Sequence, residues 1–341
     1  NLSVKQNSDK VILNWETFNI GRDASVEFFQ PSSSSTALNR VFASDPSHIY
    51  GSLKANGKLI FLNPSGVIFQ GGSKVDVGAM IASSLNMSSE NFLKDDYVFE
   101  KTNDINGLIK NEGTLSAFKE GTIALISNRI ENNGVINTPE GSTAMLSGDK
   151  VKLSLDGNKL INYSIEQGAL NSLIENNKAI NANNGSVILS SEGKDDVLSA
   201  VINNKGTIKA QGITKKGGKI FLSSKKGKIK NSGTMIASSE VSFGGKIEIT
   251  GDHIKLKTGS VINVTGKTGG GQALVGGSWQ NSNPDVYQAK TVVVEDNTKI
   301  DASSIKYGIG GEIVVWSDIH NKFGKTTVEG TLLAKGGLEG G

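Results

Sequence analysis

The stretch that decides the fold spans residues 59 to 84 and reads LIFLNPSGVIFQGGSKVDVGAMIASS. Two apolar runs flank the tetrapeptide Asn63-Pro64-Ser65-Gly66, which has strong turn chemistry. Proline fixes φ, glycine accepts φ > 0, and the asparagine side chain can bond nearby backbone groups. A second turn at residues 71–74 leads into an alternating run that begins at Val75. The pattern predicts short β-strands joined by tight turns.

The same pattern continues from this stretch toward the N-terminus. Short runs with strand-type side chains lie at residues 11–15 (VILNW), 18–21 (FNIG), 26–31 (VEFFQP), 39–41 (NRV) and 49–53 (IYGSL). The serine tract at 32–35 between them is expected to form an exposed loop. We therefore predict that the first 84 residues consist almost entirely of strands and turns.

These runs resemble, in order, the signature segments of one protein family. The resemblance rests on Asn14, Trp15, Phe18 and Asn19, then on Asn39 and Arg40, and then on Asn63, Pro64, Ser65, Gly66 and Val67. Together they are similar to the secretion domain, or haemagglutination activity domain, of two-partner-secretion (TpsA) exoproteins. That family includes filamentous haemagglutinin and the high-molecular-weight adhesins. Ser65 and Ala79 depart from the family pattern, which usually has asparagine and glycine there.

Beyond residue 100 two sequence units alternate with a period of about 20 to 27 residues. One unit reads Asn-x-Gly-x-apolar and recurs at 111–115, 132–136, 204–208 and 231–235. The other is a glycine-led alternating strand that recurs at 121–127, 141–147, 185–191, 217–224, 244–249 and 310–316. A leucine-rich repeat is excluded because its Leu-x-x-Leu-x-Leu pattern is missing. With strands of period two and no helical run, the sequence predicts an all-β, right-handed parallel β-helix (a solenoid) in which asparagines and serines stack in ladders.

We expect one elongated domain over residues 1–341, with an N-terminal cap and first coils at about 1–60. Residues 151–180 and 269–290 break the repeat and are predicted to be insertions outside the coils. An uncapped β-helix would expose unpaired strands and apolar rows. The cap core is predicted to contain Trp15, Phe18, Phe28 and Phe29. Since no signal peptide is visible at Asn1 and the sequence stops in two glycines, we expect a fragment of a larger exoprotein.

The composition excludes several classes of function. The absence of cysteine rules out disulfides, thiolate metal sites and a cysteine nucleophile. A formal net charge of +3 from 36 basic and 33 acidic residues gives no general attraction to nucleic acids. No apolar run is long enough to span a membrane as a helix, so we expect no membrane insertion.

No constellation of residues points to catalysis, a cofactor or a metal. His48, His253 and His320 are far apart and are expected to be surface or turn residues. The neighbouring pairs Asp95-Asp96 and Asp195-Asp196 would point to opposite faces of a strand, whereas paired-carboxylate hydrolysis needs two groups that face one bond. We therefore predict that the domain is not an enzyme.

Two further patterns leave alternatives open. Seven lysines crowd a short stretch: Lys215, Lys216, Lys219, Lys225, Lys226, Lys228 and Lys230. A solvated face that blocks edge pairing is the favoured interpretation, and a basic stripe for anionic glycans or an acidic partner is the alternative. Asn-x-Ser/Thr sequons occur at Asn1, Asn86, Asn162, Asn184 and Asn263, of which the last four are candidate glycosylation sites.

The resemblance implies a function. It implies the N-terminal secretion domain of a large exported adhesin of a Gram-negative bacterium, monomeric and recognised in the periplasm by a TpsB outer-membrane β-barrel transporter with POTRA domains. The full-length protein would reach the cell surface or medium and bind a host receptor or glycan. The alternative is the secretion domain of a haem-acquisition, haemopexin-binding or haemolysin-type exoprotein.

The role of the Asn63–Val67 segment has two interpretations. In the first, Asn63 accepts backbone N–H bonds, Pro64 sets φ and Gly66 occupies φ > 0, so that the turn holds the early coils in register. In the second, the segment contacts the transporter directly.

Overall fold

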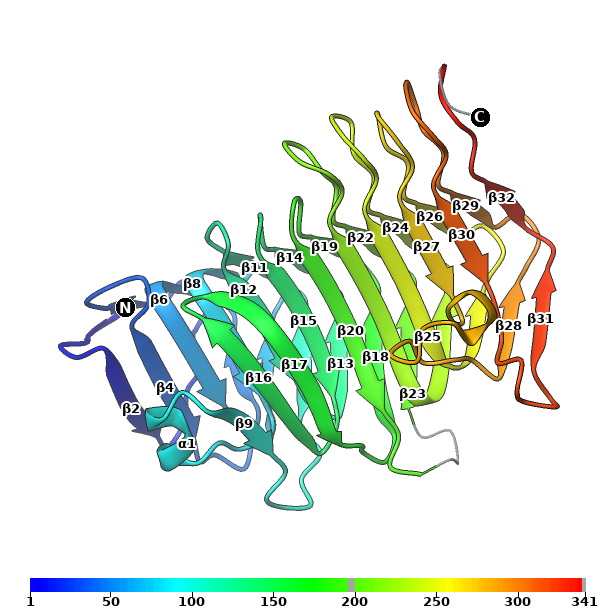
Figure 1. Ribbon diagram of the computed structural model, residues 1–341. Coiled ribbons are helices and arrows are strands. Elements are labelled where there is room, and N and C mark those ends of the chain that lie inside the picture. The colour runs from blue at the N-terminus through cyan, green and yellow to red at the C-terminus, as the bar shows by residue number, and fades with distance from the viewer. Residues whose placement is uncertain (196–199, 339–341) are drawn as a thin grey trace.

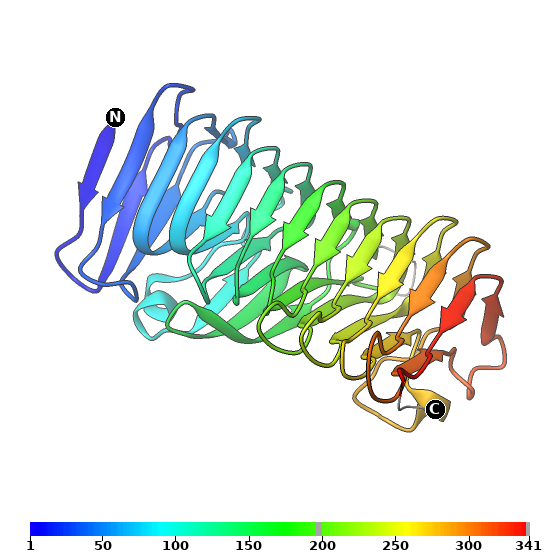
Figure 2. The ribbon, with the colours of Figure 1, turned by 90° about the horizontal axis from the view of Figure 1, so that it is seen from above.

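The computed structural model describes residues 1–195 and 200–338 as a parallel β-helix with three faces, here called A, B and C. Each coil places one strand on each face, and each strand pairs in parallel with the equivalent strand of the next coil. Figures 1 and 2 show the strands side by side along one axis, from the N-terminal end in blue to the C-terminal end in red. The predicted solenoid is therefore confirmed.

The strands follow one another along each face in chain order. Face A contains β2 (Lys10–Trp15), β4 (Thr36–Val41), β6 (Ser52–Leu62), β8 (Lys74–Ser83), β12 (Thr122–Ile126), β15 (Ser142–Ser147), β20 (Ser186–Glu192), β23 (Lys219–Asn231), β25 (Lys246–Leu256), β27 (Gln272–Val275) and β30 (Glu312–Val315). Face B contains β5 (Ser47–Ile49), β7 (Gly66–Phe69), β10 (Leu108–Asn111), β13 (Arg129–Asn132), β18 (Ser172–Asn176), β21 (Ala200–Asn204), the second parts of β23 and β25, β28 (Thr291–Val294) and β31 (Lys325–Val328). Face C contains β1 (Leu2–Lys5), β3 (Ser25–Phe29), the first parts of β6 and β8, β11 (Thr114–Ala117), β14 (Val135–Asn137), β19 (Ala179–Asn181), β22 (Thr207–Lys209), β24 (Thr234–Ile236), β26 (Val261–Asn263), β29 (Lys299–Asp301) and β32 (Thr331–Leu333).

Alternate side chains of every face point into the helix and form its inner core. On face B, for example, Ile109, Ile130 and Ile174 lie directly above one another and are fully buried. Because a strand has a side-chain period of two, this single buried row per strand produces the alternation seen in the sequence. Aliphatic rows of this kind fill the interior without large aromatic residues, which matches the low aromatic content of 6%.

A ladder of buried asparagines runs along the corner that follows face B. It consists of Asn111, Asn132, Asn176, Asn204 and Asn231, all 0% exposed. Each of the first four donates from Nδ2 to Oδ1 of the next at 2.7–2.8 Å. A buried amide without a partner is costly, so each member requires the next coil to be in register. The predicted asparagine stacking is therefore confirmed.

Replacing Asn176 by alanine is expected to lower the free energy of unfolding by about 2–4 kcal/mol. The change leaves Nδ2 of Asn132 and Oδ1 of Asn204 buried without their partners. Asn177→Ala is the matched control, because Asn177 is exposed and its bond to Asn133 lies at the surface. Urea unfolding of both variants measures the difference. Equal, small losses in the two variants would show that the ladder does not fix the register.

A second layer, here called the cover, lies over the N-terminal half of face A (Figure 1). It comprises α1 (Ser89–Leu93) and a three-stranded antiparallel sheet of β9 (Tyr97–Glu100), β16 (Lys150–Asp156) and β17 (Lys159–Gln167). Between the cover and the coils lies an outer core, whose buried members are Leu38, Ile60, Leu62, Ile81, Leu85, Met87, Phe92, Tyr97, Phe99, Ala124, Ile126, Ala144, Leu146, Val151, Leu153, Leu160 and Ile188. Face A is thus buried on both sides here, which explains why residues 59–62 and 79–83 are continuously apolar or small.

The structure changes the limits of both predicted insertions. In the first, residues 150–167 form β16 and β17 of the cover, but residues 172–181 form β18 and β19 of ordinary coils. In the second, Gln272–Val275 is strand β27 of face A, so the excursion begins after it. The excursion contains a 3-10 turn at Trp279–Asn281, and Trp279 packs on Trp316 with ring centroids 5.1 Å apart.

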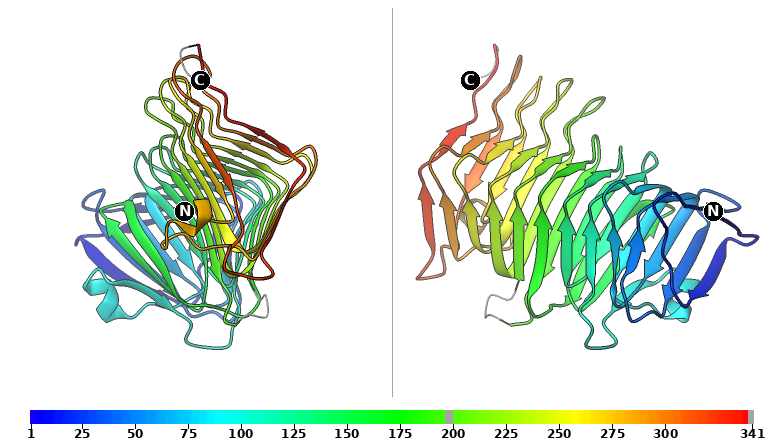
Figure 3. Two further views of the ribbon diagram at one scale, coloured as in Figure 1. Left: turned by 45° about the vertical axis from the view of Figure 1, so that its right-hand side comes forward. Right: turned by 180° about the vertical axis from the view of Figure 1, so that it is seen from behind.

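At the N-terminal end, β1 and β2 are edge strands that pair on one side only, with β3 and β4. Phe18 and Phe28 are buried and Trp15 is half-buried, packed against Phe18. The prediction that Phe29 belongs to the cap core is wrong, because its ring is 50% exposed. Phe28 and Phe29 are neighbours on a strand, so only one of them can point inward. The right-hand view of Figure 3 shows both ends of the rod from behind.

Candidate functional site: the Asn63–Val67 turn and the cover

Asn63 lies at the corner between faces A and B, and its side chain is fully buried. Its Oδ1 accepts a hydrogen bond from the Ser65 backbone N–H at 2.9 Å, which closes the predicted side-chain turn. Its Nδ2 donates to the Asp45 carbonyl at 3.2 Å and to Ser47 Oγ at 3.0 Å. The amide therefore has both its oxygen and its nitrogen engaged within the domain, and it joins its own turn to the segment that contains Asp45 and Ser47.

The rest of the turn closes onto the next coil. The Gly66 N–H donates to the Asn63 carbonyl at 2.8 Å, and Gly66 has φ of 113°. A Cβ on Gly66 would lie 2.3 Å from the Leu108 carbonyl oxygen. Pro64 and Ser65 are half-buried, and Ser65 Oγ donates to the Ser44 carbonyl at 2.8 Å. Val67 is buried in the inner core.

The other family-type residues lie in the same N-terminal coils. Asn39 is fully buried, and its Oδ1 accepts a hydrogen bond from Trp15 Nε1 at 3.0 Å. Arg40 donates to the Met87 carbonyl at 2.8 Å and to Ser89 Oγ at 2.9 Å, which ties face A to the cover. The remaining members are peripheral to these contacts. Phe18 packs edge-on against Phe61, exposed Asn19 accepts from the His48 N–H at 2.7 Å, and Asn14 is exposed beside Arg40 in the β2–β4 register.

A polar cluster beneath the cover was missed in the sequence. Lys58, on face A, is only 3% exposed, because the cover lies over it. Its Nζ lies 3.5 Å from the Tyr97 hydroxyl and 5.2 Å from the centre of that ring. The Tyr97 hydroxyl donates to Asp95 at 3.0 Å, and Lys10 pairs with the same carboxylate at 2.8 Å. Alternation predicts Lys58 to face outward, so only knowledge of the cover reveals its burial.

Burial lowers the pKa of Lys58 to about 8, while the charge of Asp95 opposes this shift and that of Lys10 adds to it. In the unfolded chain the lysine pKa is about 10.4, so above pH 8 the unfolded state binds more protons. The free energy of unfolding of the wild type should therefore rise between about pH 8 and pH 10. The rise should exceed that of a Lys58→Met variant by up to about 3 kcal/mol. Urea unfolding of both proteins at pH 7, 8, 9 and 10 measures the effect. Parallel pH profiles would contradict the burial of a charged Lys58.

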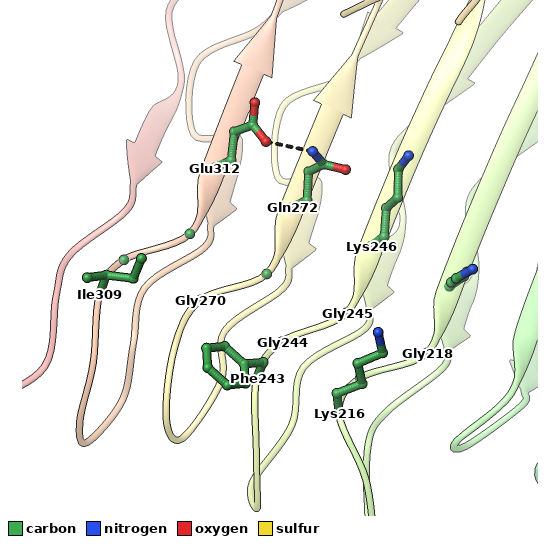
Figure 4. A pocket seen from close by; sticks show the side chains of 15 residues that line it. Lys216, Gly218, Phe243, Gly244, Gly245, Lys246, Gly270, Gln272, Ile309 and Glu312 are labelled. Atoms are coloured by element: carbon green, nitrogen blue, oxygen red, sulfur yellow. Dashed lines mark hydrogen bonds between the residues drawn. The ribbon is translucent and has the colours of Figure 1, made fainter. Parts of the chain in front are cut away.

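Figure 4 shows a groove of about 570 Å³ near the C-terminal end of face A. Paired glycines from successive coils line it, including Gly218, Gly245 and Gly311. A Cβ on any of these three would lie 2.0–2.1 Å from a carbonyl oxygen of the adjacent coil, so close stacking alone accounts for the glycines. Phe243 and Ile309 lie on one side, and Gln272 bonds Glu312 at 2.6 Å on the other (Figure 4).

The seven clustered lysines do not form one stripe. Lys215 and Lys216 lie in the loop before face A, and Lys219 is the first residue of β23 on that face. Lys228 and Lys230 lie on face B, at the far end of the same strand. Lys215 lies 3.9 Å from Glu140, and the Lys226 N–H donates to buried Asp252. The single basic stripe considered as an alternative is therefore not formed.

His48 and His253 each contact one neighbouring polar side chain. His48 Nδ1 lies 3.0 Å from Gln70 Nε2, and His253 Nδ1 lies 2.8 Å from Thr291 Oγ1. Burial, with help from neighbouring Lys228 and Lys290, lowers the pKa of His253. Asp196 lies outside the described residues. Within residues 1–195 and 200–338 no group of three or more His, Asp or Glu side chains is arranged to hold a metal ion, and no helix there is long and apolar enough to cross a membrane.

The four candidate glycosylation asparagines differ in exposure. Asn162, on β17 of the cover, is exposed, while Asn86, Asn184 and Asn263 are half-buried. The side-chain oxygens of all four accept backbone N–H bonds, from a residue one or two positions later for Asn86, Asn162 and Asn263, and from Ile213 of the next coil for Asn184. Glycosylation stays a prediction for each.

Comparison with known proteins gives a family match, a structural match and two curated relatives. Residues 1–237 match a family model described as the TPS secretion domain. The structure is similar to the crystal structure of the HMW1 secretion domain from Haemophilus influenzae, with a TM-score of 0.87 and 30% sequence identity. That similarity covers 97% of this chain and 87% of the other.

Two curated relatives from Haemophilus influenzae are named heme/hemopexin-binding protein. They are 30% identical to this chain over 236 and 248 residues, which is 65% of this chain. The chain spans only about a quarter of their length, since the aligned regions make up 25% and 26% of the relatives.

Proposed function

Because the chain belongs to the family of TPS secretion domains, we propose that it directs a larger exoprotein across the outer membrane of a Gram-negative bacterium. The transporter would be a dedicated TpsB β-barrel whose periplasmic POTRA domains recognise this domain. Outside the cell the domain would then provide the first coils on which the rest of the exoprotein folds. Each coil needs only its neighbour for stability, so folding can advance coil by coil.

The observation that carries this proposal is the similarity to the HMW1 secretion domain over 97% of the chain. The geometry adds a physical reason why export would depend on the family motif. The side-chain amide of Asn63 and the positive φ of Gly66 together fix the corner that joins the first coils. We propose that export depends on this fold, and that Asn63 itself does not contact the transporter.

The proposal is tested by expressing the domain with an N-terminal Sec signal, with and without its cognate transporter. Secretion of the domain into the medium should require the transporter. A version with shuffled coil order, matched in composition, should stay in the periplasm. Release without any transporter, at the level seen with it, would overturn the proposal.

For the full-length exoprotein, two functions compete. An adhesin that binds a host receptor or glycan follows from the resemblance to haemagglutinin-type exoproteins. Capture of haem or haemopexin is favoured by the two relatives named heme/hemopexin-binding protein. Binding of the purified full-length protein to immobilised haemopexin and to cultured epithelial cells separates the two. Haemopexin binding without cell attachment would select the second.

A further inference from the structure

A cavity of about 350 Å³ lies between the N-terminal coils and the cover. Strands β2, β4 and β6 supply Lys10, Thr36 and Lys58 to its wall, and the cover supplies Asp95 and Tyr97. The turn between β16 and β17 closes one side, where Asn158 Nδ2 donates to the Ser33 carbonyl at 2.7 Å. The cavity is therefore enclosed by residues of both the first coils and the cover.

Lys58 is the residue in this cavity without an adequate partner. Its side chain carries three N–H donors, and the hydrogen bond recorded for it is a long one, 3.5 Å to the Tyr97 hydroxyl. Among the described residues, no carboxylate oxygen lies within 4.0 Å of its Nζ, whereas Lys10 has such an oxygen at 2.8 Å. A buried charge is costly unless it is paired, so a positive charge at the base of this cavity requires a counter-charge.

The carboxylates that line the cavity do not supply this counter-charge to Lys58. Asp95 is already bound by Lys10 at 2.8 Å and by the Tyr97 hydroxyl at 3.0 Å. Asp9 and Asp156 are exposed, and water screens their charges. The buried part of the cavity is thus left with one positive charge in excess.

We propose that this cavity is a binding site for a small oxyanion, a carboxylate or phosphate group, held by the Lys58 ammonium with Thr36 Oγ1 beside it. Thr36 is 3% exposed, and its hydroxyl, which makes a long bond of 3.4 Å to the Ser34 carbonyl and also hydrogen-bonds the Tyr97 hydroxyl, lies on the same wall of the cavity. The volume leaves room for an anion of this size together with water molecules. A bound anion would tie the coils to the cover and would stabilise the N-terminal coils, a role that is independent of the proposed export function.

The test uses thermal unfolding of the domain in inorganic phosphate or acetate, with sodium chloride at equal ionic strength as the reference. We expect a saturable rise in Tm of about 2–4 °C at ten to a hundred times the Kd. Lys58→Met should melt higher in chloride and should lose the response, while Lys58→Arg should retain it. Lys54→Met, which removes an exposed lysine of the same strand, is the matched control and should respond like the wild type.

The pH dependence and a lipid arm complete the test. The anion-dependent rise should disappear as Lys58 loses its proton above about pH 8. Inorganic phosphate should raise the Tm without any lipid present. Phosphatidylglycerol vesicles should not retain the domain, because the cavity lies under the cover. Lys58-dependent retention on vesicles would assign the same chemistry to a lipid headgroup. An equal rise in Lys58→Met and wild type, or no rise at all, would overturn the proposal.

Discussion

Replacing Gly66 by valine is expected to prevent folding of the domain and to abolish its export. The Cβ would lie 2.3 Å from the Leu108 carbonyl oxygen and 2.8 Å from its backbone nitrogen. Because these atoms belong to strand β10, one coil further on, they can move only if the pairing of β7 with β10 is broken. The φ of 113° adds strain for any residue with a side chain. We expect a loss of more than about 4 kcal/mol in the free energy of unfolding.

Two other glycines separate the contributions to this effect. Gly72 also has positive φ, of 90°, but a Cβ there would meet nothing within 4 Å. Gly72→Val should therefore report the φ strain alone, about 1–2 kcal/mol. Gly71→Val, in open space and outside the positive-φ region, should be nearly neutral. Proteolysis and circular dichroism of the three variants measure the order. A folded Gly66→Val domain with wild-type stability would contradict the coil contact.

Replacing Phe99 by alanine is expected to cost about 3–5 kcal/mol and to loosen the cover. Phe99 is 0% exposed and lies in the outer core, on the strand that pairs with β16. Its removal leaves a cavity between the cover and face A and weakens the packing of the outer core, which includes Ile60 and Ile126. Hydrogen exchange should accelerate in β9 and β16 before it does so in the inner core.

Phe118→Ala is the matched control for this second prediction. Phe118 is 50% exposed on a turn between coils, so its loss should change stability by less than about 0.5 kcal/mol. Chemical denaturation of both variants gives the two values. If Phe99→Ala were as mild as Phe118→Ala, the outer core would not contribute to the stability of the early coils.

The coils could be predicted from sequence because each strand repeats one simple rule. A buried aliphatic residue alternates with a polar one, and an Asn-x-Gly corner follows, as at Asn132 and Asn204. The coil at 172–181 was missed since Lys178 stands where the other copies have glycine, which hid the unit Asn176 to Ile180. Its register with β13 and β14 is nonetheless regular.

The cover, and the burial of Lys58 beneath it, could not be predicted in the same way. Strand β9 pairs with β16, about fifty residues later, so no short-range repeat in the sequence predicts this pairing. The cover that this pairing forms buries Lys58, whereas the alternation of the strand alone would place that side chain in water. The turn chemistry of Asn63 and Gly66 was readable because proline, asparagine and glycine have specific backbone preferences. Their actual partners at Asp45 and Leu108 required the structure.

The most direct test of the account measures stability and export together for Asn63→Ala. Asn63 is fully buried with its amide engaged by Ser65, Asp45 and Ser47, so its loss removes a partner from the Ser65 N–H, the Asp45 carbonyl and the Ser47 hydroxyl. Export through the cognate transporter and the melting temperature of the purified domain are measured for this variant and for wild type. We predict that both fall together, and that protease resistance falls with them. A variant that melts and resists protease like the wild type, yet is not exported and fails to bind the POTRA domains, would show that the Asn63–Val67 turn is a recognition surface and that the structural account is wrong.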